Sequence, residues 1–345
     1  MRSFRTPAAA GMGCLFALAT TAACSGQGDA APTVTAAPST SSSAGAGTPP
    51  PSGSGTSYAP YVSAGQAAAT DAAGSPTTYN LAFVIADGDD CVPRWDGSHA
   101  VGDAAVASRI AKLKEGGARV RVSFGGADGR ELAANCDSAP ELAAAYGRAL
   151  DVAGTTLADF DIEGDELGDS ASTALRSQAI ARLQEERPGL KVSFTLPVMP
   201  KGLNKHSLAL LASANNHAVQ VSTVNLMTMN YGSKYAGDMG GYALSAAGAA
   251  HAQLRKVFKT SDATAWRGMA LTPMIGVNDV KGETFTLADA AEVRAFAEEK
   301  GIAWVSMWST ARDRQCAGGT DPAKAATHCS GVAQEPGAFA KVLAG

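Results

Sequence analysis

Short apolar or β-branched runs alternate with alanine-rich stretches of helical period through most of this chain. Each such run, bounded by polar residues or glycine, predicts a strand. The eight runs are 58–62, 80–85, 119–124, 158–162, 191–196, 223–229, 269–275 and 303–308. Helices are expected between most of them, for example at 103–115, 140–153, 170–186, 206–215 and 287–300. Strands and helices alternating eight times predict an α/β fold, a single (β/α)8 barrel of roughly 250 residues.

An open, doubly wound sheet is the alternative architecture for the same pattern. That fold needs a glycine-rich phosphate loop after its first strand. The residues in that position, Ser63-Ala64-Gly65-Gln66, do not provide such a loop. The closed barrel is therefore the preferred prediction.

The first 24 residues have the pattern of an export signal. Arg2 and Arg5 carry positive charge, an apolar run follows from Ala8, and small residues precede Cys24. Residues 21–24, Thr-Ala-Ala-Cys, resemble the lipobox of bacterial lipoproteins, in which the cysteine is acylated. We therefore expect an exported protein, either a cell-surface lipoprotein attached to the membrane through Cys24 or a secreted protein cleaved near Ala23.

Residues 25–57 consist mainly of Ala, Pro, Ser, Thr and Gly, and include three consecutive prolines at 49–51. Such a composition cannot bury enough apolar surface to offset chain entropy, so it predicts a disordered linker. The barrel domain is then expected at 58–345. After the signal, no stretch of the sequence has the length and apolarity of a membrane span.

The charge balance argues against a polyanionic partner. The chain has 28 Lys and Arg against 32 Asp and Glu, a formal net charge of −4. Nucleic acid is therefore not an expected partner. The five histidines show no metal-ligand spacing with each other or with a cysteine pair, so neither a metal nor another cofactor is expected.

Four cysteines remain for the folded part, because Cys14 lies within the expected signal and Cys24 is the lipidation candidate. In an oxidising compartment these four can pair in three ways. The pairing that closes the shortest loops joins Cys91 to Cys136 and Cys316 to Cys329.

The fourth expected strand carries the most unusual chemistry. Asp159, Asp161 and Glu163 alternate with apolar residues, so the period of two places all three carboxylates on one face, about 6 to 7 Å apart in succession. Three carboxylates so close in a partly dry barrel mouth repel one another, and at least one holds a proton near neutral pH. Glu163 is the expected acid, Asp161 the residue that orients substrate, and Asp159 its support, able to share a proton with Asp161.

These residues and their neighbours resemble the bacterial chitinases of glycoside hydrolase family 18. The family's fourth strand carries DxxDxDxE, whose last three acidic positions match Asp159, Asp161 and Glu163, while Thr156 stands at the first. This difference puts hydrogen bonding below the site in question. The family's SxGG motif on the third strand matches residues 123–126, and the resemblance implies substrate contacts for Ser123, Gly125 and Gly126.

Strands six to eight extend the resemblance, in particular to the chitinase D-like branch. Residues 227–231, Met-Thr-Met-Asn-Tyr, correspond to the family's MxYD, which holds the N-acetyl group. Met229 stands at the Tyr position, and either Asn230 or Tyr231 is the expected acetamide ligand. Trp308 is the expected floor under the sugar, because an indole offers an apolar plate to a pyranose.

The resemblance implies a monomeric chitinase that hydrolyses chitin or chito-oligosaccharides with retention, assisted by the substrate. Glu163 protonates the glycosidic oxygen, the sugar's own acetamide attacks the anomeric carbon, and Asp161 orients that acetamide. The short connection between the last two expected strands, 276–302, leaves no room for the α+β insertion of some relatives. We therefore expect a shallow substrate groove and cleavage at internal bonds of the glycan chain.

Two other functions fit the same residues. One is a chito-oligosaccharide-binding protein on the same barrel that has lost turnover, and the other is an endo-β-N-acetylglucosaminidase that acts on N-glycans. Retention of Glu163 favours an enzyme over a binding protein. A purely structural cell-wall lipoprotein would have no need of three carboxylates on one strand.

Overall fold

The computed structural model describes residues 55–127, 131–318 and 324–345. The expected signal, the lipidation candidate Cys24 and most of the expected linker lie outside these residues. Among the described residues, no helix combines the length and the apolarity needed to cross a bilayer.

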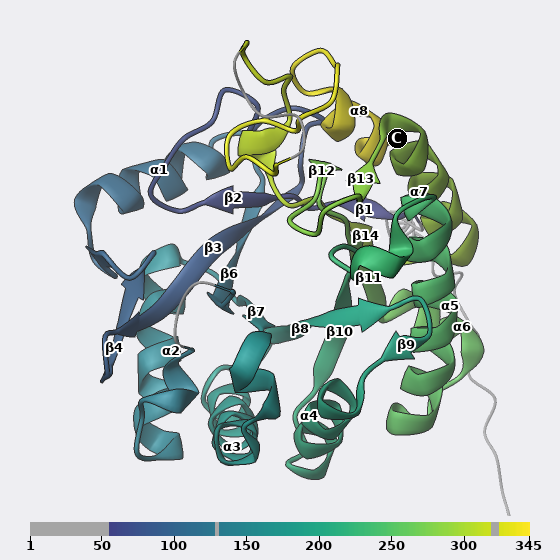
Figure 1. Cartoon of the computed structure of the whole chain (residues 1–345). Helices are drawn as coiled ribbons and strands as arrows, with labels where there is room; N and C mark the ends of the chain where they lie inside the picture. Colours follow the sequence, from purple (N-terminus) through teal and green to yellow (C-terminus); the bar gives the residue numbers. More distant parts are fainter. Residues whose placement is uncertain (1–54, 128–130, 319–323) are drawn as a thin grey trace, which may run out of the picture. The chain divides into compact units, whose positions relative to one another are not determined.

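Parallel strands form a closed ring in the described part of the chain (Figure 1). The ring strands, in chain order, are β1 (Ser57–Tyr58) with β2 (Tyr61–Ser63), β3 (Thr78–Asp87), β6 (Arg119–Gly125), β7 (Leu157–Asp161), β8 (Lys191–Met199), β10 (Val221–Met227), β11 (Met269–Thr272) and β14 (Trp304–Val305). β1 pairs with β14 and β2 pairs with β3, so the two parts of the first strand close the ring. All eight expected strands are present in the expected order.

Some boundaries differ from the predictions. The folded part begins before residue 58, because Ser57 pairs with Trp304 and the Thr56 hydroxyl donates to the Ala297 carbonyl at 2.9 Å. These two residues therefore belong to the barrel, not to the expected linker. The eighth strand is shorter than its apolar run, although Trp308 still forms an isolated bridge with Met274.

The helices of the described chain surround this ring (Figure 1). They are α1 (Ala104–Lys114), α2 (Ala139–Ala153), α3 (Ser170–Glu186), α4 (Lys205–Asn216), α5 (Met239–Phe258), α6 (Asp262–Arg267), α7 (Leu287–Lys300) and α8 (Ala338–Ala344). α3 and α7 have the predicted bounds. α7 starts with a reciprocal capping box between Thr286 and Asp289 and stops at Gly301, whose φ of 68° suits a left-handed end.

Short elements connect the ring to its helices. They are the strands β4 (Asp90–Trp95), β5 (His99–Ala100), β9 (Gly202–Leu203), β12 (Gly276–Val277) and β13 (Thr284–Phe285), and the 3₁₀ turns η1 (Leu132–Ala134), η2 (Gly164–Gly168), η3 (Ser233–Tyr235) and η4 (Thr310–Arg312). β12 and β13 form a small hairpin between β11 and α7.

Aromatic packing joins the fourth strand to its helix layer. The ring of Phe160 lies 4.9 Å from Tyr146 of α2, 5.3 Å from Phe124 and 5.7 Å from Phe194, measured between centroids. All four side chains are fully buried. Since successive strand residues face opposite sides, this packing turns Asp159 and Asp161 into the barrel interior, as the alternation predicted.

The barrel interior is largely polar. Its buried side chains are connected by hydrogen bonds from strand to strand, and they include Asn80, Arg121, Ser123, Asp159, Ser193, Thr195, Asn225, Thr272 and Ser306. A buried polar network is favourable only when its members are satisfied. Within this network Asp159 accepts hydrogen bonds from Ser123, Ser193 and Thr195.

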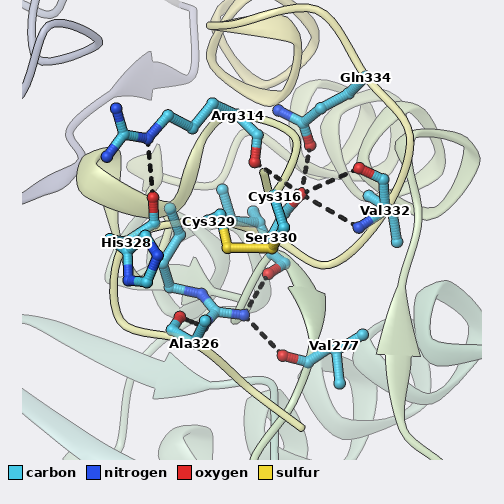
Figure 2. The surroundings of a disulfide bond; sticks show 11 residues. Val277, Arg314, Cys316, Ala326, His328, Cys329, Ser330, Val332 and Gln334 are labelled. Atoms are coloured by element: carbon cyan, nitrogen blue, oxygen red, sulfur yellow. Dashed lines mark hydrogen bonds between the residues drawn. A yellow bond between two sulfur atoms is a disulfide. The ribbon is translucent and has the colours of Figure 1, made fainter. Parts of the chain in front are cut away.

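Two disulfides are present, Cys91–Cys136 and Cys316–Cys329, with Cα atoms 4.7 and 5.0 Å apart. The predicted shortest-loop pairing is therefore confirmed. Figure 2 shows the second bond, beside which Arg314 donates to the His328 carbonyl at 2.8 Å. This bond fastens the segment that follows β14.

The same segment packs closely on β12. Gly276 has a φ of 75°, and a Cβ at this position would lie 1.9 Å from the Ser330 carbonyl oxygen. The buried guanidinium of Arg312 donates to the Ile275 and Val277 carbonyls at 2.9 and 2.6 Å. Burial lowers the pKa of Arg312 to about 10. The segment is thus held over the carboxyl-terminal ends of β11 and β14.

Candidate active site

The three carboxylates of the fourth strand run from the barrel interior towards its mouth. Asp159 is 1% exposed and Asp161, the last residue of β7, is 4% exposed. Glu163 lies just beyond the strand, at the start of η2, and is partly exposed. The predicted shared face is therefore observed for Asp159 and Asp161, with Glu163 following at the mouth, where active sites of such barrels are located.

Asp159 is held by hydroxyl groups from three other strands. Tyr61 of β2 and Ser123 of β6 donate to Oδ2 at 3.0 and 2.7 Å, and Ser193 of β8 donates to Oδ1 at 2.6 Å. Thr195 of β8 lies 2.9 Å from both oxygens. Hydrogen bonds to a charged acceptor are stronger than neutral ones, so this shell fixes the carboxylate in one orientation.

Asp161 is in a different environment. Its Oδ1 is buried and has no hydrogen-bond partner among the described residues. Burial raises the pKa of Asp161 well above its usual range, and the carboxylates of Glu163 and Asp159 raise it further. This direction agrees with the expectation that one carboxyl in the group holds a proton near neutral pH. Asp161 thus has one buried oxygen whose hydrogen-bonding capacity no described residue uses.

The glycine pair after β6 allows the chain to approach Asp161 closely. Gly125 and Gly126 have φ values of 99° and 93°. A Cβ on Gly125 would lie 2.2 Å from the Asp161 carbonyl oxygen, and one on Gly126 would lie 2.8 Å from the Phe83 ring. The Gly126 amide donates to the Asp161 carbonyl at 3.0 Å. Only glycine fits this geometry without displacement of the carboxylate strand.

Trp308 lies beside the interior network. Its ring stacks on Phe83 with centroids 5.5 Å apart and meets the edge of Tyr61 at 5.7 Å. Tyr61 also donates to Asp159, so its ring lies between the partly exposed indole of Trp308 and that carboxylate. The role of Trp308 as the floor under a sugar stays a prediction.

The strand-six residues are engaged with the loop after β12. The Asn230 side chain is exposed, with φ 53°, and its amide donates to Asp279 at 3.0 Å while its oxygen accepts from the Val280 amide at 3.3 Å. Met229 is partly exposed. These bonds connect the β10 and β12 loops.

Tyr231 is buried rather than open to a ligand. It packs against Tyr235 and Tyr242, with centroids 6.0 and 6.1 Å away. Its backbone amide donates to Glu283 at 3.1 Å, and burial raises the pKa of its phenol. Of the two expected acetamide ligands, Asn230 is thus the exposed one.

Thr156 lies away from the site. It is exposed and precedes β7, and its carbonyl accepts from Lys191 at 2.8 Å. Thr156 is therefore not placed to weaken the hydrogen bonding below the carboxylates, and that expectation was wrong. The support comes from the hydroxyl shell of Asp159 instead.

Sequence reasoning missed several residues that surround the carboxylates: Tyr61, Phe83, Ser193, Thr195 and Asn225. The polar residues Ser193 and Thr195 alternate with apolar ones in the fifth run, a signal that they face the barrel interior. Phe83 and Tyr61 lie within the second and first runs and gave no signal beyond strand propensity.

One further acidic group occurs among the described residues. Asp238, Asp289 and Glu292 have carboxylate oxygens within 4.8 Å of one another. Asp238 accepts from the Gly241 amide at 2.8 Å and Asp289 from the Gly240 amide at 3.0 Å. Both amides belong to the first turn of α5, so the two contacts cap the start of that helix and account for the positions of both aspartates.

A closed (β/α)8 barrel with buried carboxylates at the end of its fourth strand is the arrangement of a barrel glycoside hydrolase. No family model matches the chain. It is 35% identical over 275 residues to the probable bifunctional chitinase/lysozyme of Escherichia coli K12, covering 74% of this chain and 31% of that protein. It is also 34% identical over 248 residues to endochitinase 11 of Metarhizium anisopliae, covering 68% of this chain and 47% of that protein.

Solved structures give the same result. The catalytic domain of a hyperthermophilic chitinase from Pyrococcus furiosus aligns with a TM-score of 0.73 and 29% identity, over 83% of this chain and 93% of that one. A family 18 chitinase from Pseudoalteromonas aurantia shares the fold, with a TM-score of 0.55 and 13% identity. The chain belongs to glycoside hydrolase family 18, a family of glycosidases. It spans less than half the length of the two curated relatives.

Proposed function

We propose that this chain is an exported, monomeric chitinase that hydrolyses β-1,4-linked N-acetylglucosamine polymers with retention of configuration. The carrying observation is the buried, unpartnered oxygen of Asp161 between an anchored Asp159 and a partly exposed Glu163. Relatives named as chitinases support the choice of substrate.

In the proposed mechanism the substrate's acetamide is the nucleophile. Glu163 protonates the glycosidic oxygen, and the acetamide oxygen attacks the anomeric carbon. Asp161 accepts a hydrogen bond from the acetamide N–H through its free oxygen and stabilises the positive charge of the oxazolinium. Glu163 then deprotonates the water that opens the oxazolinium, which regenerates the acid.

The remaining residues bind the sugar. Trp308 provides the apolar floor under the pyranose, with Phe83 beside it. Asn230 is the acetamide ligand that we favour over Tyr231, because its side chain is exposed. Met229, Ser123, Gly125 and Gly126 shape the site. Asp159 does not contact substrate and acts by holding Asp161 in place.

The groove is proposed to be shallow, as in the chitinase D-like branch without a sizeable α+β insertion. Between β11 and β14 the chain contains the β12–β13 hairpin and α7. Such a groove suits cleavage within chains. Product analysis on soluble chito-oligosaccharides should therefore yield several product lengths early in the reaction, and disaccharides released only from one end would contradict it.

Hydrolysis of a chromogenic chito-oligoside tests the enzyme proposal. Glu163→Gln should lower kcat by about 10² to 10⁴-fold, because the proton donor is lost. Glu185→Gln, on an exposed position of α3, is the matched control and should keep the wild-type rate. Equal background rates in wild type and Glu163→Gln, with chito-oligosaccharide binding retained, would instead identify a binding protein.

Attachment to the membrane is proposed through an acylated Cys24. The motif at residues 21–24 supports it. Labelled fatty acid should enter the full-length wild type in a bacterial host and not the Cys24→Ala variant. An unlabelled wild type recovered from the medium would show secretion after ordinary signal cleavage.

A further inference from the structure

Glu163 lies where the fourth ring strand passes into a turn. The residue before it, Ile162, still donates its backbone amide to the Thr195 carbonyl of β8 at 3.1 Å. Glu163 has extended backbone angles, φ −144° and ψ −177°, and Gly164, with a φ of 58°, ends the extended run and begins η2. The backbone before Glu163 is therefore fixed by strand pairing, and the backbone after it follows the position of η2.

The side chain of Glu166 joins η2 to the loop after β6. Its Oε1 accepts a hydrogen bond from the backbone amide of Glu131 at 2.7 Å. Glu166 is partly buried, whereas Asp165 beside it in the turn is exposed. Leu167 of η2 is packed in the apolar core, but apolar contacts are non-directional. The hydrogen bond of Glu166 therefore gives the turn a directional contact.

Glu131 is itself held in one place. Its side chain is fully buried, and its Oε2 accepts from Nε and Nη2 of Arg176 on α3 at 2.9 and 2.6 Å. The same oxygen accepts from the Ala133 amide at 3.0 Å. Removing one partner of a buried ion pair is strongly destabilising. The loop at Glu131 is thus fixed relative to α3, and Glu166 ties η2 to this fixed loop.

Glu131 also packs towards the carboxylate strand. A Cβ on Gly125 would lie 3.3 Å from Glu131 Cγ and 2.2 Å from the Asp161 carbonyl oxygen. Gly125 therefore separates Glu131 from the end of β7 with no space to spare. Asp161 is located through this packing, and Glu163 is located through η2 and Glu166. The separation of the two carboxyls thus depends on contacts that both involve Glu131.

We propose that Glu166 is a positioning residue for the hydrolysis proposed above: its hydrogen bond to the Glu131 amide holds η2 so that Glu163 delivers its proton to the glycosidic oxygen. The role rests on the proposed function, in which Asp161 and Glu163 act on the same sugar. A proton donor must lie within hydrogen-bond reach of the oxygen that it protonates. A misplacement of about 1 Å is enough to slow catalysis about a hundredfold. Glu166 acts through Glu163 and not on the substrate.

Two variants separate the hydrogen bond from the charge. Glu166→Gln loses the charge and keeps an acceptor oxygen at the same reach, whereas Glu166→Asp keeps the charge on a side chain one methylene shorter. Glu166→Asp should lower kcat on a chito-oligosaccharide about tenfold with KM nearly unchanged, since Leu167 still restrains the turn. Glu166→Gln should stay within about twofold of the wild type. Asp165→Ala, an exposed change in the same turn, is the matched control and should keep the wild-type kcat.

The leaving group supplies a readout that a general loss of structure would not move. A nitrophenolate leaves with less help from an acid than a sugar hydroxyl does. Glu166→Asp should therefore slow hydrolysis of an unmodified chito-oligosaccharide by a larger factor than hydrolysis of a nitrophenyl chito-oligoside. Partial unfolding would lower both rates by the same factor. If Glu166→Asp fails to fold, as judged by circular dichroism, Glu166→Ala takes its place.

The outcomes separate this role from the function on which it rests. With an active wild type, an equal loss in Glu166→Gln and Glu166→Asp would assign the effect to charge and overturn the positioning role alone. Equal slowing of both substrates, or a folded Glu166→Asp with the wild-type rate, would do the same. A wild type that hydrolyses neither substrate would overturn both this role and the proposed function.

Discussion

The Tyr61 hydroxyl donates to the Asp159 carboxylate at 3.0 Å, across a sequence separation of 98 residues. Tyr61→Phe removes this donor and keeps the ring that contacts Trp308. We expect kcat to fall about tenfold with KM nearly unchanged, because one hydrogen bond to a charged group contributes about 1.5 kcal/mol or more. Initial rates of hydrolysis of the chromogenic chito-oligoside, measured over a range of substrate concentrations, give both kcat and KM.

The matched control for that variant is Tyr146→Phe. The Tyr146 hydroxyl donates to Glu131 outside the ring of strands, so its loss should lower the free energy of unfolding by about 1 to 2 kcal/mol without a change in kcat. A Tyr61→Phe enzyme with wild-type kcat would show that the hydroxyl is dispensable.

Asp161 should make the protein less stable as pH rises. Its pKa is raised in the folded state, chiefly by burial, so the folded protein holds this proton at pH values where the unfolded chain has lost it. The resulting stability is fully present below the unfolded pKa and is lost as pH rises through the folded pKa. Asp161→Asn removes that loss, so its free energy of unfolding should fall less between pH 4 and pH 7 than that of the wild type.

Urea unfolding at several pH values measures this difference. Asp151→Asn is the control of opposite sign, because Arg187 lowers the pKa of the Asp151 carboxyl. Its contribution is present above the unfolded pKa and is lost as pH falls, and it is small because the pair is largely exposed. Parallel pH curves for wild type and Asp161→Asn would contradict the raised pKa.

Gly125→Ala should impair both folding and hydrolysis. The added Cβ would meet the Asp161 carbonyl oxygen at 2.2 Å, at a φ of 99°. We expect a loss of about 3 kcal/mol or more in unfolding free energy and a lower kcat in whatever protein folds. Gly189→Ala is the control, since Gly189 has a φ of 92° and open space around it, and it should cost only about 1 to 2 kcal/mol. Similar melting curves for the two variants would refute the role of close approach.

Trp308→Ala should raise KM for short chito-oligosaccharides by about tenfold, because a stacked aromatic contact contributes about 1.5 kcal/mol. Expressed as free energies, the effect on KM should be larger than the effect on unfolding. Trp266→Ala, which removes an indole of α6 stacked on His251 of α5, should change stability and leave KM unchanged. An unchanged KM in Trp308→Ala would exclude the floor.

Replacing both Cys316 and Cys329 by Ala should destabilise the segment after β14. The bond spans a sequence separation of 13, for which the chain-entropy relation gives about 3 kcal/mol. Urea unfolding of the double variant should therefore resemble that of wild type with this bond reduced. Unchanged stability would mean that packing of Ser330 on Gly276 is sufficient by itself.

Much of the fold could be predicted because strand position depends on local pattern. The eight apolar runs gave the ring, and α3 and α7 were bounded correctly by their polar flanks. α5 was not predicted. Its sequence contains Gly240, Gly241 and Gly248, which lower helix propensity. Its buried alanines, such as Ala246 and Ala250, pack closely against the barrel, and this tertiary contact outweighs the propensity.

The candidate site, like the fold, could be predicted from the sequence only in part. The shared face of Asp159 and Asp161 follows from the period of a single strand. The shell around Asp159 requires the register of β7 with β8, in which Asp159 pairs with Ser193 and Asp161 with Thr195. It also requires the closure that brings in Tyr61. Register and closure depend on contacts between distant segments, which no local pattern contains.

The edge contact between Tyr61 and Trp308, 5.7 Å between ring centres, joins residues from the two ends of the barrel domain. A nascent or refolding chain has no complete sugar floor until its last strand joins its first. Recovery of hydrolysis during refolding should therefore report the step that joins the last strand to the first, a step that a measurement of total helix content does not single out.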